Sequence, residues 1–97
     1  MPKLAVIGTI EATPGQRDQL ILLLAEHKAR CLRDESGTLT FEIMVSNDDE
    51  TKIHIYEVYE NAAAFAIHLD NSSIRRFREQ SAGMVTGLVV SKCAPVG

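Results

Sequence analysis

The stretch KIHIYEVYENAAAFAIHLD, residues 52–70, contains the change of sequence pattern that decides the fold. Its first part alternates like a β-strand as far as Glu60, and its second part has helical spacing from Asn61 onward. Asn61 is a favoured helix N-cap, and His68 falls in the last turn of the predicted helix. One face of the predicted strand is formed by Ile53, Ile55, Glu57 and Tyr59. This passage therefore brings a carboxylate, a phenol and an imidazole into one neighbourhood.

The other elements complete a β-α-β-β-α-β order in which the second helix is broken in two. Strands are expected at residues 3–13, 38–46, 52–60 and 84–93. Helices are expected at residues 14–33, 62–69 and 74–82. Thr13 is expected to cap the first helix, with Pro14 at its first position, and Gly37 to be the left-handed residue after it. This order predicts an α+β, ferredoxin-like fold, a four-stranded antiparallel sheet with helices on one face.

Length and composition exclude several classes of protein. The 97 residues are expected to form one domain, residues 1–97. A net charge of -3 and an aromatic content of 5% argue against a nucleic-acid partner, which would require a basic surface with stacking aromatics. No apolar run approaches the roughly 20 residues that cross a bilayer, and the start lacks a signal-peptide pattern. We therefore expect a soluble, cytoplasmic protein with no membrane partner.

The apolar residues outnumber the positions that one layer of helices can cover. The strands at residues 3–13 and 84–93 carry apolar side chains on both faces, whereas the helices shelter only one face of the sheet. An exposed apolar area of several hundred Å² is a liability in a monomer. A second copy that packs sheet against sheet would cover it, so we expect a homodimer that forms an α/β barrel.

Short motifs resemble those of a known family. They are ESGTLTFE at residues 35–42, IYEVY at residues 55–59, and the helix at residues 62–68 with its histidine. On these motifs the chain resembles the antibiotic biosynthesis monooxygenase family of small, dimeric α/β-barrel proteins. The family includes cofactor-free oxygenases of quinols and polycyclic phenols, haem-degrading enzymes, and an isomerase of the phosphorylated autoinducer-2 signal. The EQ at residues 79–80 and MVTG at residues 84–87 are most similar to that isomerase and to quinol monooxygenase relatives.

The chain also departs from the family pattern. Many relatives have Trp where this chain has Tyr59, and a second His where it has Ser73. The haem-degrading members of the family share an Asn on the first strand and a Trp in the active site. This chain has no Trp, and Ala5, Ile7 and Gly8 occupy the middle of its first strand. The resemblance therefore does not extend to haem degradation.

The expected catalytic residues are His68, Glu57 and Tyr59. The resemblance implies that Glu57 lies between sheet and helices, where burial raises the pKa of a carboxyl group. His27 falls on the apolar stripe of the first helix, where a buried imidazole needs a partner. The expected substrate-binding residues are His27, Phe41, Phe65, Phe77 and Leu24. Each polar candidate also has a purely structural interpretation. Glu57 can be a hydrogen-bonded carboxylate, Tyr59 a core aromatic, and the histidines core residues whose ring nitrogens have hydrogen-bond partners.

No metal and no cofactor are expected. The three histidines are separated by 27 and 14 residues, so no two of them have the i, i+4 spacing of a helical metal-ligand pair. Cys31 and Cys93 lie far apart and fit no metal-ligand pattern, and both are expected to be buried thiols. Phosphate-binding glycine loops and nucleophile elbows are also absent from the sequence.

Three functions remain open. The first is a cofactor-independent monooxygenase that oxidises a small, quinol-like hydroxy-aromatic with O2. His68, supported by Glu57, would deprotonate the phenol, the phenolate would reduce O2 directly, and Tyr59 would hold the second substrate oxygen. The second is an isomerase of a small phosphorylated, ketose-like molecule, with the phosphate held by Arg33, Arg75 or Arg76. The third is a non-catalytic, ligand-binding dimer of the same fold.

Overall fold

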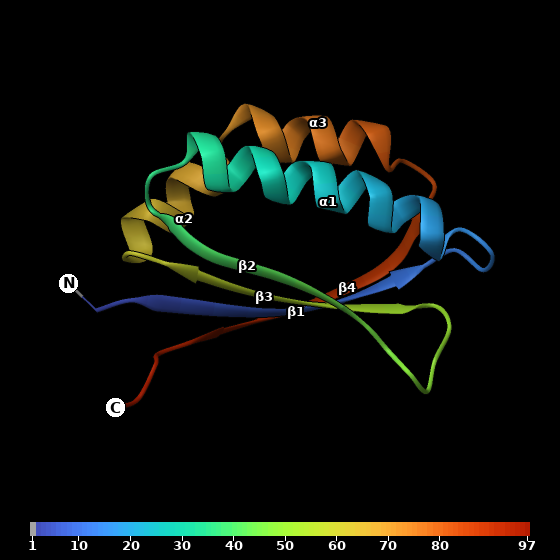
Figure 1. The fold of residues 1–97 in the computed structure, drawn as a ribbon, viewed down its shortest axis with the longest axis horizontal. Helices are drawn as coiled ribbons and strands as arrows, with labels where there is room; N and C mark the ends of the chain where they lie inside the picture. The colour runs from blue at the N-terminus through green and yellow to red at the C-terminus, as the bar shows by residue number, and fades with distance from the viewer. Residues whose placement is uncertain (1) are drawn as a thin grey trace.

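The computed structural model describes residues 2–97, and these form a four-stranded antiparallel sheet with three helices on one face (Figure 1). The strands lie in the order β2-β3-β1-β4. They are β1 (Leu4–Ala12), β2 (Thr38–Val45), β3 (Lys52–Tyr59) and β4 (Val85–Cys93). The helices are α1 (Arg17–Asp34), α2 (Ala62–Leu69) and α3 (Ser72–Gln80). This confirms the predicted ferredoxin-like fold with a divided second helix.

The core lies between α1 and the inner face of the sheet. Spacings of three and four residues place one stripe of α1 against the sheet, and its buried residues are Leu20, Leu24, His27 and Cys31. The predicted inner face of β3 is buried throughout, at Ile53, Ile55, Glu57 and Tyr59. Two ionisable side chains from each element therefore lie inside an otherwise apolar layer. Cys93, in contrast to the prediction, is partly exposed.

The first helix begins later than the sequence indicates. It starts at Arg17 with Gln16 as N-cap, so the prediction of Pro14 as first residue and Thr13 as cap is wrong. Gly15 has a φ of 82°, which turns the chain before the helix can form. The Thr13 hydroxyl donates instead to the carbonyl oxygen of Gly83, 2.8 Å away.

Gly37 serves close packing and not a left-handed turn. Within residues 2–97, glycines with positive φ occur at positions 15, 83 and 97, so the prediction for Gly37 is wrong. A Cβ at Gly37 would lie 2.4 Å from the Cβ of Ala64 in α2. Helix α1 ends at the C-cap Glu35 in extended backbone, and the glycine lets α2 approach the turn that follows.

Asparagine side chains begin both short helices. The side chain of Asn61 accepts a hydrogen bond from the backbone N–H of Ala64 at 2.9 Å, as its predicted capping role requires. Asn71 caps α3 by accepting from the N–H of Ser72 at 2.8 Å. The third helix therefore starts and ends two residues earlier than the predicted range of 74–82. No helix within residues 2–97 has both the length and the apolar character needed to cross a membrane.

The outer face of the sheet has no helix against it in the part of the chain that the structure describes (Figure 1). Ile7 of β1 lies opposite Tyr56 of β3 on this face, and the two are 48% and 38% exposed. Val89 of β4, beside Thr9 of β1, is 70% exposed. We call Ile7, Met44, Tyr56 and Val89 the outer apolar patch.

Candidate active site

A cavity of about 340 Å³ lies between the helices and the inner face of the sheet. Most of its walls are apolar, and residues from all four strands and all three helices line it. Every predicted site residue except Tyr59 lines this cavity: His68, Glu57, His27, Phe41, Phe65, Phe77 and Leu24. The polar groups that reach the cavity are few, which is typical of a site for a small apolar ligand.

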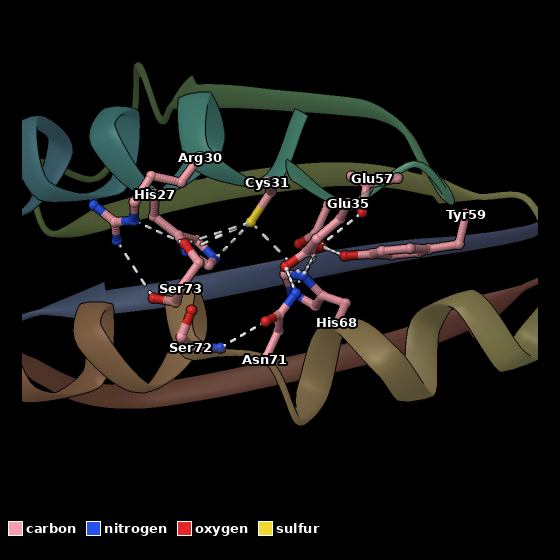
Figure 2. A network of polar contacts seen from close by, with 11 residues as sticks. His27, Arg30, Cys31, Glu35, Glu57, Tyr59, His68, Asn71, Ser72 and Ser73 are labelled. Carbon is pink, nitrogen blue, oxygen red and sulfur yellow. Dashed lines mark hydrogen bonds and ion pairs between the residues drawn. The ribbon is translucent and has the colours of Figure 1, made fainter. Parts of the chain in front are cut away.

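Tyr59 is fully buried and is not part of the cavity wall. Its hydroxyl donates a hydrogen bond to Oε1 of Glu57 (Figure 2). Burial, together with the adjacent Glu57 carboxylate, raises the pKa of Tyr59 well above its ordinary value. The phenol therefore stays protonated and acts on Glu57, whereas the sequence analysis expected it to contact the substrate.

Glu57 is a buried carboxyl group at the floor of the cavity, with an exposed fraction of 5%. Burial raises the pKa of Glu57, and the nearby Glu35 carboxylate adds to the increase. The hydrogen bond donated by Tyr59 and the nearby His68 lower the pKa of Glu57 and so oppose this increase. Glu57 therefore exchanges a proton more readily near neutral pH than an exposed glutamate does.

His68 lies between two carboxyl groups. Its Nδ1 is 2.8 Å from Oε1 of Glu35, and its Nε2 is 3.8 Å from Oε1 of Glu57. Glu35 also accepts from the Thr38 hydroxyl at 2.9 Å and from the Asn71 side-chain amide at 3.1 Å. Because a carboxylate can only accept, this arrangement assigns the hydrogen of neutral His68 to Nδ1. The lone pair of Nε2 is then directed away from Glu35, on the Glu57 side of the ring.

Glu35 is the site residue that sequence reasoning missed. The sequence places it only at the start of the ESGTLTFE motif that follows the first helix, yet its side chain is 5% exposed and bonds to His68 (Figure 2). The spacing of the buried residues in α1 could have identified Glu35. The buried stripe Leu24, His27 and Cys31 advances by three and four residues, and one further step of four reaches Glu35.

A second polar group centres on Ser73, at the start of α3. Its hydroxyl lies 2.8 Å from Nδ1 of His27 and accepts from Nε of Arg30 at 2.9 Å. Burial lowers the pKa of His27 to about 4, with His68 and Arg30 adding to the decrease, so His27 is neutral at pH 7. Burial raises the pKa of the Cys31 thiol to about 12, and the nearby Glu35 carboxylate adds to the increase.

Aromatic rings hold the two buried imidazoles in place. Phe77 stacks on His27 with ring centres 5.2 Å apart, and Phe41 meets His27 edge-on at 5.6 Å. Phe65 lies almost parallel to His68 at 6.3 Å. These contacts limit rotation of both imidazoles and give the cavity flat, apolar walls that suit a planar ligand.

Comparison with known proteins gives the family. The family profile described as "Antibiotic biosynthesis monooxygenase" matches residues 3–80. A solved Chloroflexus aurantiacus protein, provisionally described as an antibiotic biosynthesis monooxygenase, is 27% identical with a TM-score of 0.86, covering 98% of this chain and 94% of that one.

Two more distant solved structures share the fold. A Caulobacter crescentus protein with the same provisional description is 16% identical and has a TM-score of 0.93, over 99% of this chain and 92% of its own. A Mycobacterium tuberculosis protein is 24% identical with a TM-score of 0.86, over 98% and 96% of the two chains. The profile match over most of its length shows that this chain belongs to the antibiotic biosynthesis monooxygenase family.

Proposed function

We propose that the protein is a cofactor-independent monooxygenase that oxidises a small, quinol-like hydroxy-aromatic with O2. The observation that carries this proposal is the pairing of an apolar cavity of about 340 Å³ with the imidazole of His68 and the carboxyl group of Glu57. An apolar cavity of this size suits a compound of one or two rings. Family membership supports oxygenase chemistry, and the quinol substrate and the quinol-oxidising branch of the family are part of the proposal.

The first step is removal of a proton from a substrate hydroxyl by Nε2 of His68. Glu35 holds the opposite nitrogen at 2.8 Å and stabilises the imidazolium that forms. Positioned proton transfer of this kind accelerates reactions by about 10²–10⁴-fold. Glu57, kept in place by Tyr59, is the second group that can bond to a substrate oxygen.

The later steps use electrons from the substrate alone. The phenolate gives one electron to O2, and the resulting semiquinone and superoxide combine to form a C–O bond. The His68 imidazolium protonates the distal peroxide oxygen to give a hydroperoxide. The hydrogen on the same ring carbon then leaves as a proton, the electrons of that C–H bond form the new C=O bond as the O–O bond breaks, and the departing hydroxide combines with the proton to give water. A quinol and O2 thus become a hydroxyquinone and water, with all four electrons supplied by the quinol. The apolar walls exclude water from the radical pair.

We further propose that two copies associate through the outer apolar patch. Its members are 38–70% exposed; Ile7 and Tyr56 lie opposite each other, whereas Val89 lies opposite Thr9 and Met44 opposite His54 on the same face. Sheet-on-sheet packing of two such faces would remove this apolar area from water and form the barrel that the resemblance implies.

An isomerase acting on a phosphorylated, ketose-like molecule is the second candidate, because Arg78 lines the cavity and could hold a phosphate. The arginines expected for this role lie elsewhere. Arg33 pairs with Asp34 in an exposed ion pair, and Arg75 and Arg76 are exposed and outside the cavity wall. The third candidate, a non-catalytic ligand-binding dimer, uses the same cavity without the proton transfer.

The test is oxygen uptake by the purified protein with a panel of hydroquinones and naphthohydroquinones, corrected for autoxidation without protein. We expect uptake equal to the hydroxyquinone formed, and a loss of at least about 100-fold in His68→Ala. Ile67→Ala, at a 63% exposed position next to His68 on α2 and outside the cavity wall, serves as the matched control and retains turnover. Unchanged uptake in His68→Ala removes His68 from the mechanism, and turnover without O2 uptake favours the isomerase.

A further inference from the structure

Three side chains of the types that bind transition metals converge on the inner side of α1. His27 and Cys31 are four residues apart on one face of this helix, and His68 reaches them from α2 (Figure 2). One ligand atom from each lies within 4.8 Å of the others, and all three residues are buried. No metal-ligand pattern was predicted for Cys31 from the sequence, although His27 and Cys31 have i, i+4 spacing on one helix.

We propose that His27, Cys31 and His68, completed by Glu35, form a binding site for a divalent transition-metal ion of the Zn²⁺ type. The site shares His68 and Glu35 with the proposed oxygenase mechanism, but the inference rests on the arrangement of the ligands and not on that activity. Imidazole and thiolate groups are the ligands that Zn²⁺ prefers, and an i, i+4 pair on a helix is a common way to present two of them.

The distances around the sulfur match those of a tetrahedral site. Sγ of Cys31 lies 3.6 Å from Nε2 of His27 and 3.7 Å from Nδ1 of His68. Bond lengths of about 2.3 Å to sulfur and about 2.0–2.1 Å to nitrogen put two such ligands about 3.5 Å apart at a tetrahedral angle. Binding then requires the two imidazoles to turn toward a common centre beside the sulfur.

A candidate fourth ligand lies next to His68, and an outer contact holds His27. Oε1 of Glu35 lies 2.8 Å from Nδ1 of His68, so the carboxylate can move from hydrogen bonding that nitrogen to binding the ion next to it. The Ser73 hydroxyl lies 2.8 Å from Nδ1 of His27, which leaves Nε2 as the ring nitrogen available to an ion. A hydrogen bond to the ring nitrogen that does not bind the metal fixes the orientation of a metal-binding histidine.

Charge balance favours a divalent ion. An ion that binds Sγ displaces the thiol proton to solvent, so the site contributes a thiolate from Cys31 and a carboxylate from Glu35. These two negative charges neutralise the two positive charges of the ion. Neutralisation is essential at this position, because an unpaired charge would be costly where all the ligands are buried.

The test uses Co²⁺ as the spectroscopic probe and the full chain carrying Cys93→Ser. In this variant Cys31 is the only thiol, so a thiolate-to-cobalt charge-transfer band in the near ultraviolet can come from no other residue. We expect this band together with the visible bands of tetrahedral Co²⁺, saturating at one ion per chain and abolished by added Zn²⁺. The matched variant Cys31→Ser, which keeps Cys93, should lack the charge-transfer band and bind Co²⁺ at least about 100-fold more weakly.

Two results overturn the proposal. One is a folded Cys93→Ser protein that gives no charge-transfer band with Co²⁺. The other is a Cys31→Ser protein with the same band as the unaltered chain, which would assign the metal to Cys93. Because the Cys93→Ser titration is decisive by itself, the test holds even if Cys31→Ser does not fold.

Discussion

Glu35, at the end of α1, accepts a hydrogen bond from Nδ1 of His68 in α2 across 2.8 Å. Thr38 and Asn71 donate to the same carboxylate, so its position is fixed from three directions. The charged partner of the histidine thus comes from a helix end and not from the strand that carries Glu57. This pairing determines which imidazole nitrogen is free to take a proton.

Glu35→Gln tests this positioning role. The amide can still accept a hydrogen bond from His68, but it no longer stabilises the imidazolium, so we expect kcat for quinol oxidation to fall by about 10- to 100-fold with little change in KM. Steady-state oxygen uptake measures both constants. Glu26→Gln, which removes an exposed carboxylate on α1, is the control. An unchanged kcat in Glu35→Gln, or an increase confined to KM, contradicts the role.

Tyr59→Phe distinguishes a contact with Glu57 from a contact with substrate. The substitution leaves a buried Glu57 oxygen without its donor, so we expect the free energy of unfolding to drop by about 1–3 kcal/mol. KM should stay within a few-fold, because Tyr59 is outside the cavity wall. Urea unfolding and oxygen uptake give the two quantities. A large rise in KM with unchanged stability would show that the phenol binds the substrate.

Gly37→Ala tests the close approach of α2 to the turn after α1. The added methyl group would meet the Ala64 side chain, so we expect a loss of about 1–3 kcal/mol in unfolding free energy. The double variant Gly37→Ala, Ala64→Gly removes the clash and should recover part of this loss. Additive losses in the double variant would mean that the two positions do not meet.

Val89→Glu tests association through the outer apolar patch. Val89 is 70% exposed in a single copy, so a glutamate there does not disturb the core but introduces a charge into the proposed interface. We expect the unaltered chain to sediment as a dimer at micromolar concentration and Val89→Glu as a monomer. Leu22→Glu, at a 66% exposed position on α1, should remain dimeric. A monomeric unaltered chain would refute the dimer.

The sequence predicted much of this arrangement because side-chain periodicity determines which face each residue occupies. The alternation of β3 placed Glu57 on one face with Ile53 and Ile55, the family resemblance turned that face toward the helices, and the spacing of α1 placed His27 on the apolar stripe of that helix. Periodicity predicts which face of the strand a side chain occupies, but not which group its end contacts. The sequence therefore predicted a contact between Tyr59 and the substrate, whereas the hydroxyl bonds to Glu57.

The remaining features depend on tertiary contacts that no local pattern contains. Glu35 follows the last helical residue, where the backbone turns, and its inward direction depends on His68 and Asn71 being supplied by other elements. The meeting of Cys31 with His68 likewise depends on how α2 packs against α1. The need for glycine at position 37 arises from Ala64 and not from the helix end itself.

The side-chain amide of Asn71 makes two bonds with different purposes. Its oxygen starts α3 by accepting from Ser72, and its nitrogen holds the second oxygen of Glu35 at 3.1 Å. The connection between α2 and α3 therefore has a constrained length, because one inserted residue would prevent a single Asn71 side chain from reaching both Ser72 and Glu35. The hairpin at residues 46–51 carries no such link to the cavity, so we expect natural length variation among relatives to accumulate there and to spare this connection.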